Sequence, residues 1–148
     1  MRRILRRTLP LLLAFSIVMT SSALADGFGS VENAELSRSS AYINNCSGRI
    51  SPQGNGKFNI VFTVTGTGLM DQIGAMTIKI YKNGAFTDMF RYTYSGRGGM
   101  MGSNTTSWTD SERYQGVSGS SYSAVICFYA ANSNGSDTIF YTTASVVV

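Results

Sequence analysis

Alternation of apolar and polar residues is clearest over residues 57–65. The apolar residues occupy every second position there: Phe58, Ile60, Phe62 and Val64. Successive side chains of a β-strand point to opposite faces, so this period of two predicts a strand with one buried face. Gly66–Gly68 is expected to end the strand, and residues 69–74 are expected to form a connection.

In a second alternating run, Met76, Ile78 and Ile80 occupy every second position and so share one side of a strand. Asn83-Gly84 follows this run. Asn and Gly accept the positive φ angles of a two-residue hairpin turn. Residues 86–94 are again rich in aromatic and β-branched side chains. This region therefore predicts a β-hairpin that turns at Asn83-Gly84.

The C-terminal stretch from Tyr122 to Val148 contains two β-rich runs on either side of residues 132–136, which read Asn-Ser-Asn-Gly-Ser. Such runs fit a pleated, half-buried surface, and Asn and Gly favour tight turns. We expect a long antiparallel hairpin at the centre of the domain. If Ile126 and Phe128 face its core, Cys127 faces away from it.

The rest of the chain carries weaker signals. Ala41–Cys46 is expected to form the first strand, and residues 48–57 a connection rich in turns. Residues 95–121 are rich in Gly and Ser, which predicts a loop with one short strand over residues 104–110. No helix longer than a turn is expected. The pattern predicts an all-β domain over residues 41–148, an antiparallel, immunoglobulin-like β-sandwich of about seven strands, with a small β-barrel as the alternative.

The N-terminal 25 residues have the features of a secretory signal peptide. A basic leader precedes an apolar run, and Ala23-Leu24-Ala25 provides a cleavage site before Asp26. An uncleaved membrane anchor is the alternative. We expect residues 1–25 to be removed, residues 26–40 to be a flexible segment, and the protein to be secreted (extracellular).

Cleavage changes the charge of the chain. The full sequence has 12 Lys and Arg against 8 Asp and Glu, but four arginines lie within residues 1–7. All acidic residues lie at or after Asp26, so the mature chain has 8 basic and 8 acidic residues. A neutral mature chain gives no electrostatic reason to expect nucleic acid, or membrane after signal cleavage, as a partner.

Cys46 and Cys127 are the only two cysteines. An even number of cysteines in an exported chain predicts a disulfide between them. The alternative is a reactive thiol, which needs a basic or cationic neighbour.

The C-terminal hairpin carries a first resemblance to a known family. The alternating pattern of Tyr122, Ala124, Ile126, Phe128, Ala130, Asn132 and Gly135 resembles the last hairpin of immunoglobulin-like and fibronectin type III sandwiches. In antibody domains, however, the tyrosine lies two residues before the cysteine, whereas here Tyr122 lies five before Cys127.

A second resemblance covers more of the chain. It rests on Ala41-Tyr42-Ile43 with Cys46, on residues 68–75, on Ile78-Lys79-Ile80-Tyr81 and on Phe128-Tyr129-Ala130. These segments resemble short secreted proteins of Gram-positive bacteria, a family known only as a domain of unknown function. The resemblance implies no activity and no catalytic residues.

Several kinds of chemistry are disfavoured. The chain has 0 histidines, which excludes the usual Ser-His-Asp and Cys-His catalytic sites and most transition-metal sites. We expect no cofactor, no metal and no catalytic residue. A hydrolase that uses carboxylates alone, for example Asp110 with Glu112, is the remaining enzyme hypothesis.

Aromatic residues are the strongest functional signal. Trp108 and Tyr114 lie in or beside the glycine-rich region, together with Asp110. Such rings stack on sugars, and Asp reads hydroxyl groups, although the same rings could pack in the core. We expect a non-enzymatic interaction module that binds an unknown protein or glycan at the cell exterior. The alternative is a carbohydrate-binding module that uses Trp108, Tyr114 and Asp110.

Overall fold

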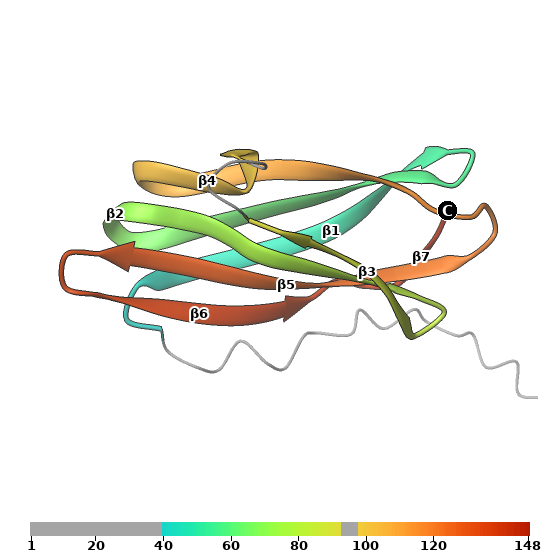
Figure 1. The fold of residues 1–148 in the computed structure, drawn as a ribbon. Coiled ribbons are helices and arrows are strands. Elements are labelled where there is room, and N and C mark those ends of the chain that lie inside the picture. Colours follow the sequence, from blue (N-terminus) through green and yellow to red (C-terminus); the bar gives the residue numbers. More distant parts are fainter. Residues whose placement is uncertain (1–39, 93–97) are drawn as a thin grey trace, which may run out of the picture. The chain divides into compact units, whose positions relative to one another are not determined.

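The computed structural model describes residues 40–92 and 98–148, which form one antiparallel sheet of seven strands (Figure 1). The strands are β1 (Ile43–Gly54), β2 (Lys57–Lys82), β3 (Ala85–Arg91), β4 (Met101–Gln115), β5 (Ser121–Asn132), β6 (Gly135–Thr142) and β7 (Val146–Val147), and a short 3-10 helix, η1 (Gly98–Met100), precedes β4. The sheet is curled into a half-barrel. The predicted all-β class and antiparallel pairing are confirmed.

The 26-residue strand β2 is the axis of the fold. Its first part pairs with β1 on one edge and β4 on the other. Its last part pairs with β5 on one edge and β3 on the other, and β5 continues the sheet to β6. Every other long strand except β6 is therefore hydrogen-bonded directly to β2.

The sheet curls because β2 and β4 bend together. Thr65 of β2 pairs with Ser107 of β4, and the next pair is Met70 with Thr105. Between these two pairs, β2 therefore contains more residues than β4. Extra residues on one strand of a pair bend that strand and let it pass from one layer to another. We call β1, residues 57–65 of β2 and residues 107–115 of β4 the first arm; residues 72–82 of β2 with β3, β5 and β6 form the second arm (Figure 1).

The hydrophobic core lies between the two arms. Each predicted core residue is buried: Phe58, Ile60, Phe62, Ile78, Ile80, Ile126 and Phe128. Gly48 of β1 shows how closely the arms approach, because a Cβ atom there would lie 2.5 Å from Cδ1 of Ile126 on β5. Both predicted hairpins are present, and Asn83 and Gly84 have the positive φ angles, 49° and 81°, that their turn requires.

Three local predictions were wrong. Residues 48–54 continue strand β1, residues 66–74 remain within β2, and the Gly- and Ser-rich segment after η1 forms the 15-residue strand β4. In each case, pairing with a neighbouring strand provides hydrogen bonds that the low intrinsic β-propensity of Gly and Ser does not predict. The predicted signal peptide at residues 1–25, most of the predicted flexible segment at 26–40 and residues 93–97 lie outside the described residues.

The predicted disulfide between Cys46 and Cys127 was also wrong. Both cysteines are free thiols and both are buried. Cys46 belongs to the core between the arms, whereas Cys127 follows the opposite parity from Ile126 and Phe128 and lies beside Thr77 and Lys79 on the outer face of the second arm. The sheet itself separates the two sulfur atoms.

Candidate functional site

The three side chains predicted to bind a ligand share one face of β4. Trp108, Asp110 and Tyr114 are partly buried, as is Glu112 on the same side, whereas the alternate residues at 109, 111 and 113 point outward and are exposed. Trp108 is paired with Val64, and Asp110 with Phe62, both buried residues of β2. The face that carries the predicted residues is therefore the inner face of the first arm.

Tyr114 is part of an aromatic cluster. Its ring centre lies 5.3 Å from that of Phe58 and 6.1 Å from those of Phe90 and Tyr122. Burial raises the pKa of Tyr114, and the nearby Asp88 and Tyr122 raise it further. The ring thus packs between the two arms, against Phe58 of the first and against Phe90 and Tyr122 of the second.

Trp108 also takes part in packing. Its indole Nε1 donates a hydrogen bond to the carbonyl oxygen of Gly99 at 2.7 Å, and the ring covers Gly102, where no side chain would fit. Asp110 lies against Gly99 as well. The structure therefore brings Trp108 and Asp110 together under η1, while Tyr114 lies at the far end of the strand.

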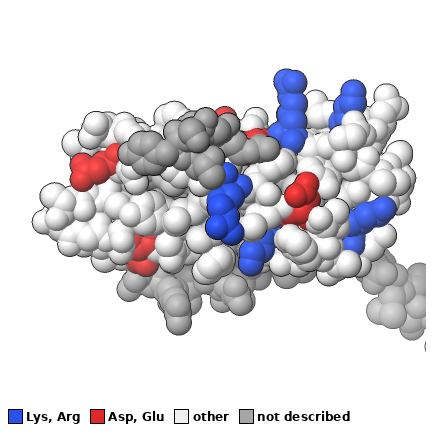
Figure 2. Space-filling model, in the orientation of Figure 1, with Lys and Arg blue, Asp and Glu red and all other residues white. Residues whose placement is uncertain are grey.

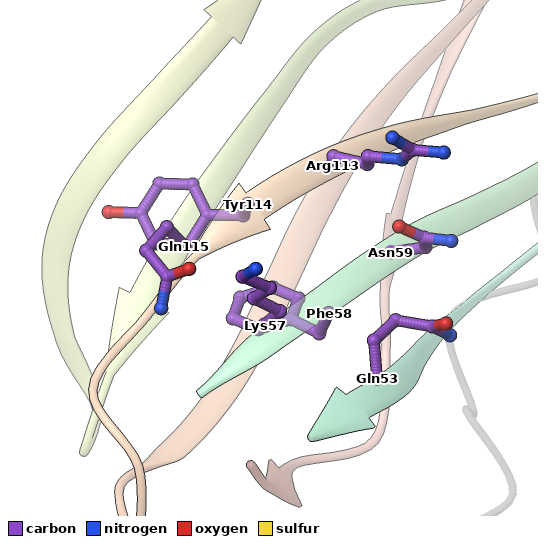
Figure 3. Close-up of a pocket in the computed structure, with 7 residues that line it drawn as sticks. All are labelled: Gln53, Lys57, Phe58, Asn59, Arg113, Tyr114 and Gln115. Atoms are coloured by element: carbon purple, nitrogen blue, oxygen red, sulfur yellow. The ribbon is translucent and has the colours of Figure 1, made fainter. Parts of the chain in front are cut away.

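A hollow of about 490 Å³ lies at the end of the first arm where β2 begins and β4 ends (Figure 3). It is lined by Gln53 of β1, by Lys57, Phe58 and Asn59 of β2, and by Arg113, Tyr114 and Gln115 of β4. Figure 3 shows the side chains of Arg113 and Asn59 on adjacent strands extending to the same side, while Tyr114 points to the opposite side of β4. Among the described residues that line the hollow, none carries a carboxylate.

The local backbone explains this arrangement. Gly54, Asn55 and Gly56 all have positive φ angles and form the tight turn between β1 and β2. The side chain of Gln115 donates hydrogen bonds to the carbonyl oxygens of Asn55, at 3.1 Å, and Gly116, at 3.0 Å. The turn and the end of β4 are thereby fixed beside each other.

The hollow belongs to a larger polar surface, the outer face of the first arm. Strand parity assigns these residues to it: Asn45, Ser47, Arg49, Ser51 and Gln53 of β1, Lys57, Asn59, Val61, Thr63 and Thr65 of β2, and Ser107, Thr109, Ser111, Arg113 and Gln115 of β4. The hydroxyl groups of Thr63 and Thr109 confirm the parity, because they are hydrogen-bonded across the strands at 2.9 Å. A second hollow, of about 160 Å³, opens beside Arg49.

Sequence reasoning identified Tyr114 but missed the polar residues around it. Each looks like an ordinary solvated position in a strand, since alternation says only that it points outward. These polar positions differ from ordinary ones because Arg49, Lys57 and Arg113 lie on the same face of three paired strands, with no acidic residue between them. That grouping depends on the pairing register of segments as far apart as β1 and β4.

Other kinds of site find no support among the described residues. Within residues 40–92 and 98–148, no three Cys, Asp or Glu side chains are grouped so that they could hold a metal ion. The same residues include no helix that is long and apolar enough to cross a membrane.

Comparison with family models, with curated proteins and with solved structures gave no match. The resemblance to secreted proteins of Gram-positive bacteria therefore stays a prediction.

Proposed function

We propose that this chain is an exported, non-enzymatic binding module that contacts its ligand through the outer face of the first arm. The observation that carries the proposal is the hollow between Gln53, Asn59 and Arg113, which opens on a continuous polar surface of three strands. Amide, hydroxyl and cationic groups on a rigid sheet can form several hydrogen bonds to a ligand without rearrangement.

Two features favour binding over catalysis. The chain has no histidine, and the carboxylates Asp110 and Glu112 lie on the inner face of β4, away from the hollow. A glycosidase needs two carboxylates on opposite sides of its substrate in a cleft. The signal peptide at residues 1–25 favours a partner outside the cell, a glycan or a protein.

A module that binds neutral sugars is the second candidate. The ring of Tyr114 and three amide side chains, those of Gln53, Asn59 and Gln115, line the same hollow. Aromatic rings and amides are the groups that usually hold neutral sugars. Tyr114 is committed to the aromatic cluster, however, so this candidate has little free ring surface to use.

The immunoglobulin-like character of the sheet belongs to the same proposal. It is supported by the hairpin of β5 and β6, whose inward residues Ile126 and Phe128 pack in the core. An experimental structure of the mature chain would test the strand connections.

A glycan array tests the binding proposal. The mature chain, residues 26–148, is compared with the double variant Gln53→Ala, Asn59→Ala, which removes two amides from the hollow. The matched control Ser123→Ala, Thr142→Ala removes two polar groups from the second arm. We expect the first variant to lose most of the binding and the control to keep it. Equal binding by all three proteins would contradict the proposed face.

A further inference from the structure

We infer that the outer face of the first arm binds an acidic polysaccharide, through Arg49, Lys57 and Arg113. This inference rests on the proposed function and names its ligand class. Of the 15 outward positions, three are cationic, none is acidic, and nearly all the others are amides or hydroxyl-bearing residues. The face therefore has a local charge of about +3 at neutral pH, because Lys and Arg are protonated there.

The charge is segregated within the molecule. The mature chain has as many acidic as basic residues, so the surplus of cations on this face must be balanced elsewhere. On β4 the two acidic residues, Asp110 and Glu112, alternate with the outward residues and point inward. In the view of Figure 2, basic side chains gather in the middle and at the right with a few acidic side chains among them, while the left end shows acidic side chains.

The spacing of the cations fits a repeating charge. Asn59 pairs with both Ser51 and Arg113, so Lys57 lies one row from Arg113 and two rows from Arg49. With about 4.8 Å between strands and about 6.8 Å between rows, the three Cα atoms are roughly 8 to 14 Å apart. Flexible Lys and Arg side chains can span such gaps to neighbouring charged sugars of one chain.

The chemistry of the cations fits anionic groups. Arg binds carboxylate, sulfate and phosphate oxygens with two parallel hydrogen bonds, and Lys adds a mobile charge. The amide of Asn59 and the hydroxyl groups of Ser51 and Ser111 lie between the cations and can bind the sugar hydroxyls. Because the outward positions include no carboxylate, no acidic group of this face competes with the ligand for the cations.

Nucleic acid is the competing polyanion, and the face disfavours it. Proteins that bind single strands add aromatic platforms on which bases stack. The only apolar residue among the outward positions is Val61. Binding of a nucleic acid would use the phosphates alone and would show no preference over a polysaccharide of equal charge.

The test compares dextran sulfate and polygalacturonate with uncharged dextran, using the mature chain and calorimetry. We expect binding to both acidic polymers, none to dextran, and weaker binding at about 0.3 M salt than at about 0.05 M salt because salt screens the charges. The triple variant Arg49→Gln, Lys57→Gln, Arg113→Gln should lose at least about tenfold in affinity, which corresponds to about 1.4 kcal/mol.

The control is the variant Lys79→Gln, Lys82→Gln, Arg91→Gln, which removes the same charge from the second arm. It should bind like the wild type, and unchanged thermal midpoints should show that both variants fold. The inference is overturned if the control loses as much affinity, if dextran binds as well as dextran sulfate, or if single-stranded DNA of equal charge binds more tightly.

The outcomes also separate the inference from the proposal it rests on. Neutral glycans could bind to the wild type and to the triple variant Arg49→Gln, Lys57→Gln, Arg113→Gln, but not to the variant Gln53→Ala, Asn59→Ala. That result would overturn the acidic ligand and leave the proposed binding face in place. If no change on the first arm alters binding, the proposed face is wrong as well.

Discussion

Cys46 and Cys127 face opposite sides of the curled sheet, although both are buried. Cys46 of β1 points into the core between the arms, and Cys127 of β5 is covered on the outer face of the second arm. Burial raises the pKa of Cys46 to about 11. Burial also raises the pKa of Cys127, an effect that the charge of Lys79 and a hydrogen bond with Thr77 partly oppose. Neither sulfur is therefore poised as a nucleophile at neutral pH.

Thiol titration should find two free thiols per chain in protein that is denatured without reductant. In the native state both should react slowly with a thiol reagent, because they are buried and protonated. Cys127, whose raised pKa is partly opposed by Lys79, should react first. Absence of titratable thiols after denaturation would show that the sulfur atoms are oxidised.

Alkaline pH should destabilise the chain partly through Cys46. Its thiol ionises near pH 9.0 in the unfolded chain and near pH 11 in the folded one, so the unfolded state loses its proton first. The contribution of Cys46 to the free energy of unfolding is thus complete below pH 9 and is lost as pH rises toward 11.

The Cys46→Ala variant isolates this contribution, because both proteins share the tyrosines that titrate in the same range. Between pH 9 and 11, the wild type should lose more stability than the variant, by on the order of 2 kcal/mol. Urea denaturation at several pH values measures the difference. Parallel curves for the two proteins would contradict the buried position of Cys46.

Gly74 should tolerate no side chain. A Cβ atom there would collide with the backbone carbonyl of Met100, and backbone cannot turn aside as a side chain can. We expect Gly74→Ala to destabilise the domain by about 1–3 kcal/mol. The matched control is Gly68→Ala in the same strand, where a Cβ atom would meet nothing within 4 Å, and its effect should stay within about 0.5 kcal/mol. Denaturant unfolding compares the two variants.

Trp108, the only tryptophan, reports which face binds a ligand. Its ring lies on the inner face of β4 and its Nε1 is bonded to Gly99, so a ligand on the outer face should leave its fluorescence unchanged. Titration with dextran sulfate should therefore give no emission shift at saturation. A shift or strong quenching by a neutral glycan would instead support the carbohydrate-binding module that uses Trp108.

Much of the fold follows from local pattern. The alternation from Phe58 to Val64 determines both a strand and its buried face, and Asn83-Gly84 determines a turn, because side-chain parity and φ preference act within a few residues. The same parity places Cys127 away from the core. The predicted export of the chain and its even number of cysteines favoured a disulfide. A disulfide bond, however, also needs both sulfur atoms on the same side of the sheet.

The sequence alone does not determine how the strands come together. The joint bend of β2 and β4, the strand formed by residues 101–115 and the grouping of Arg49, Lys57 and Arg113 all depend on pairing between distant segments. Lys57 and Arg113 lie 56 positions apart in the chain and one row apart in the sheet. Alternation shows that each points outward, but only the tertiary structure decides which residues share a face, because the register is set by the packing of both arms around one core.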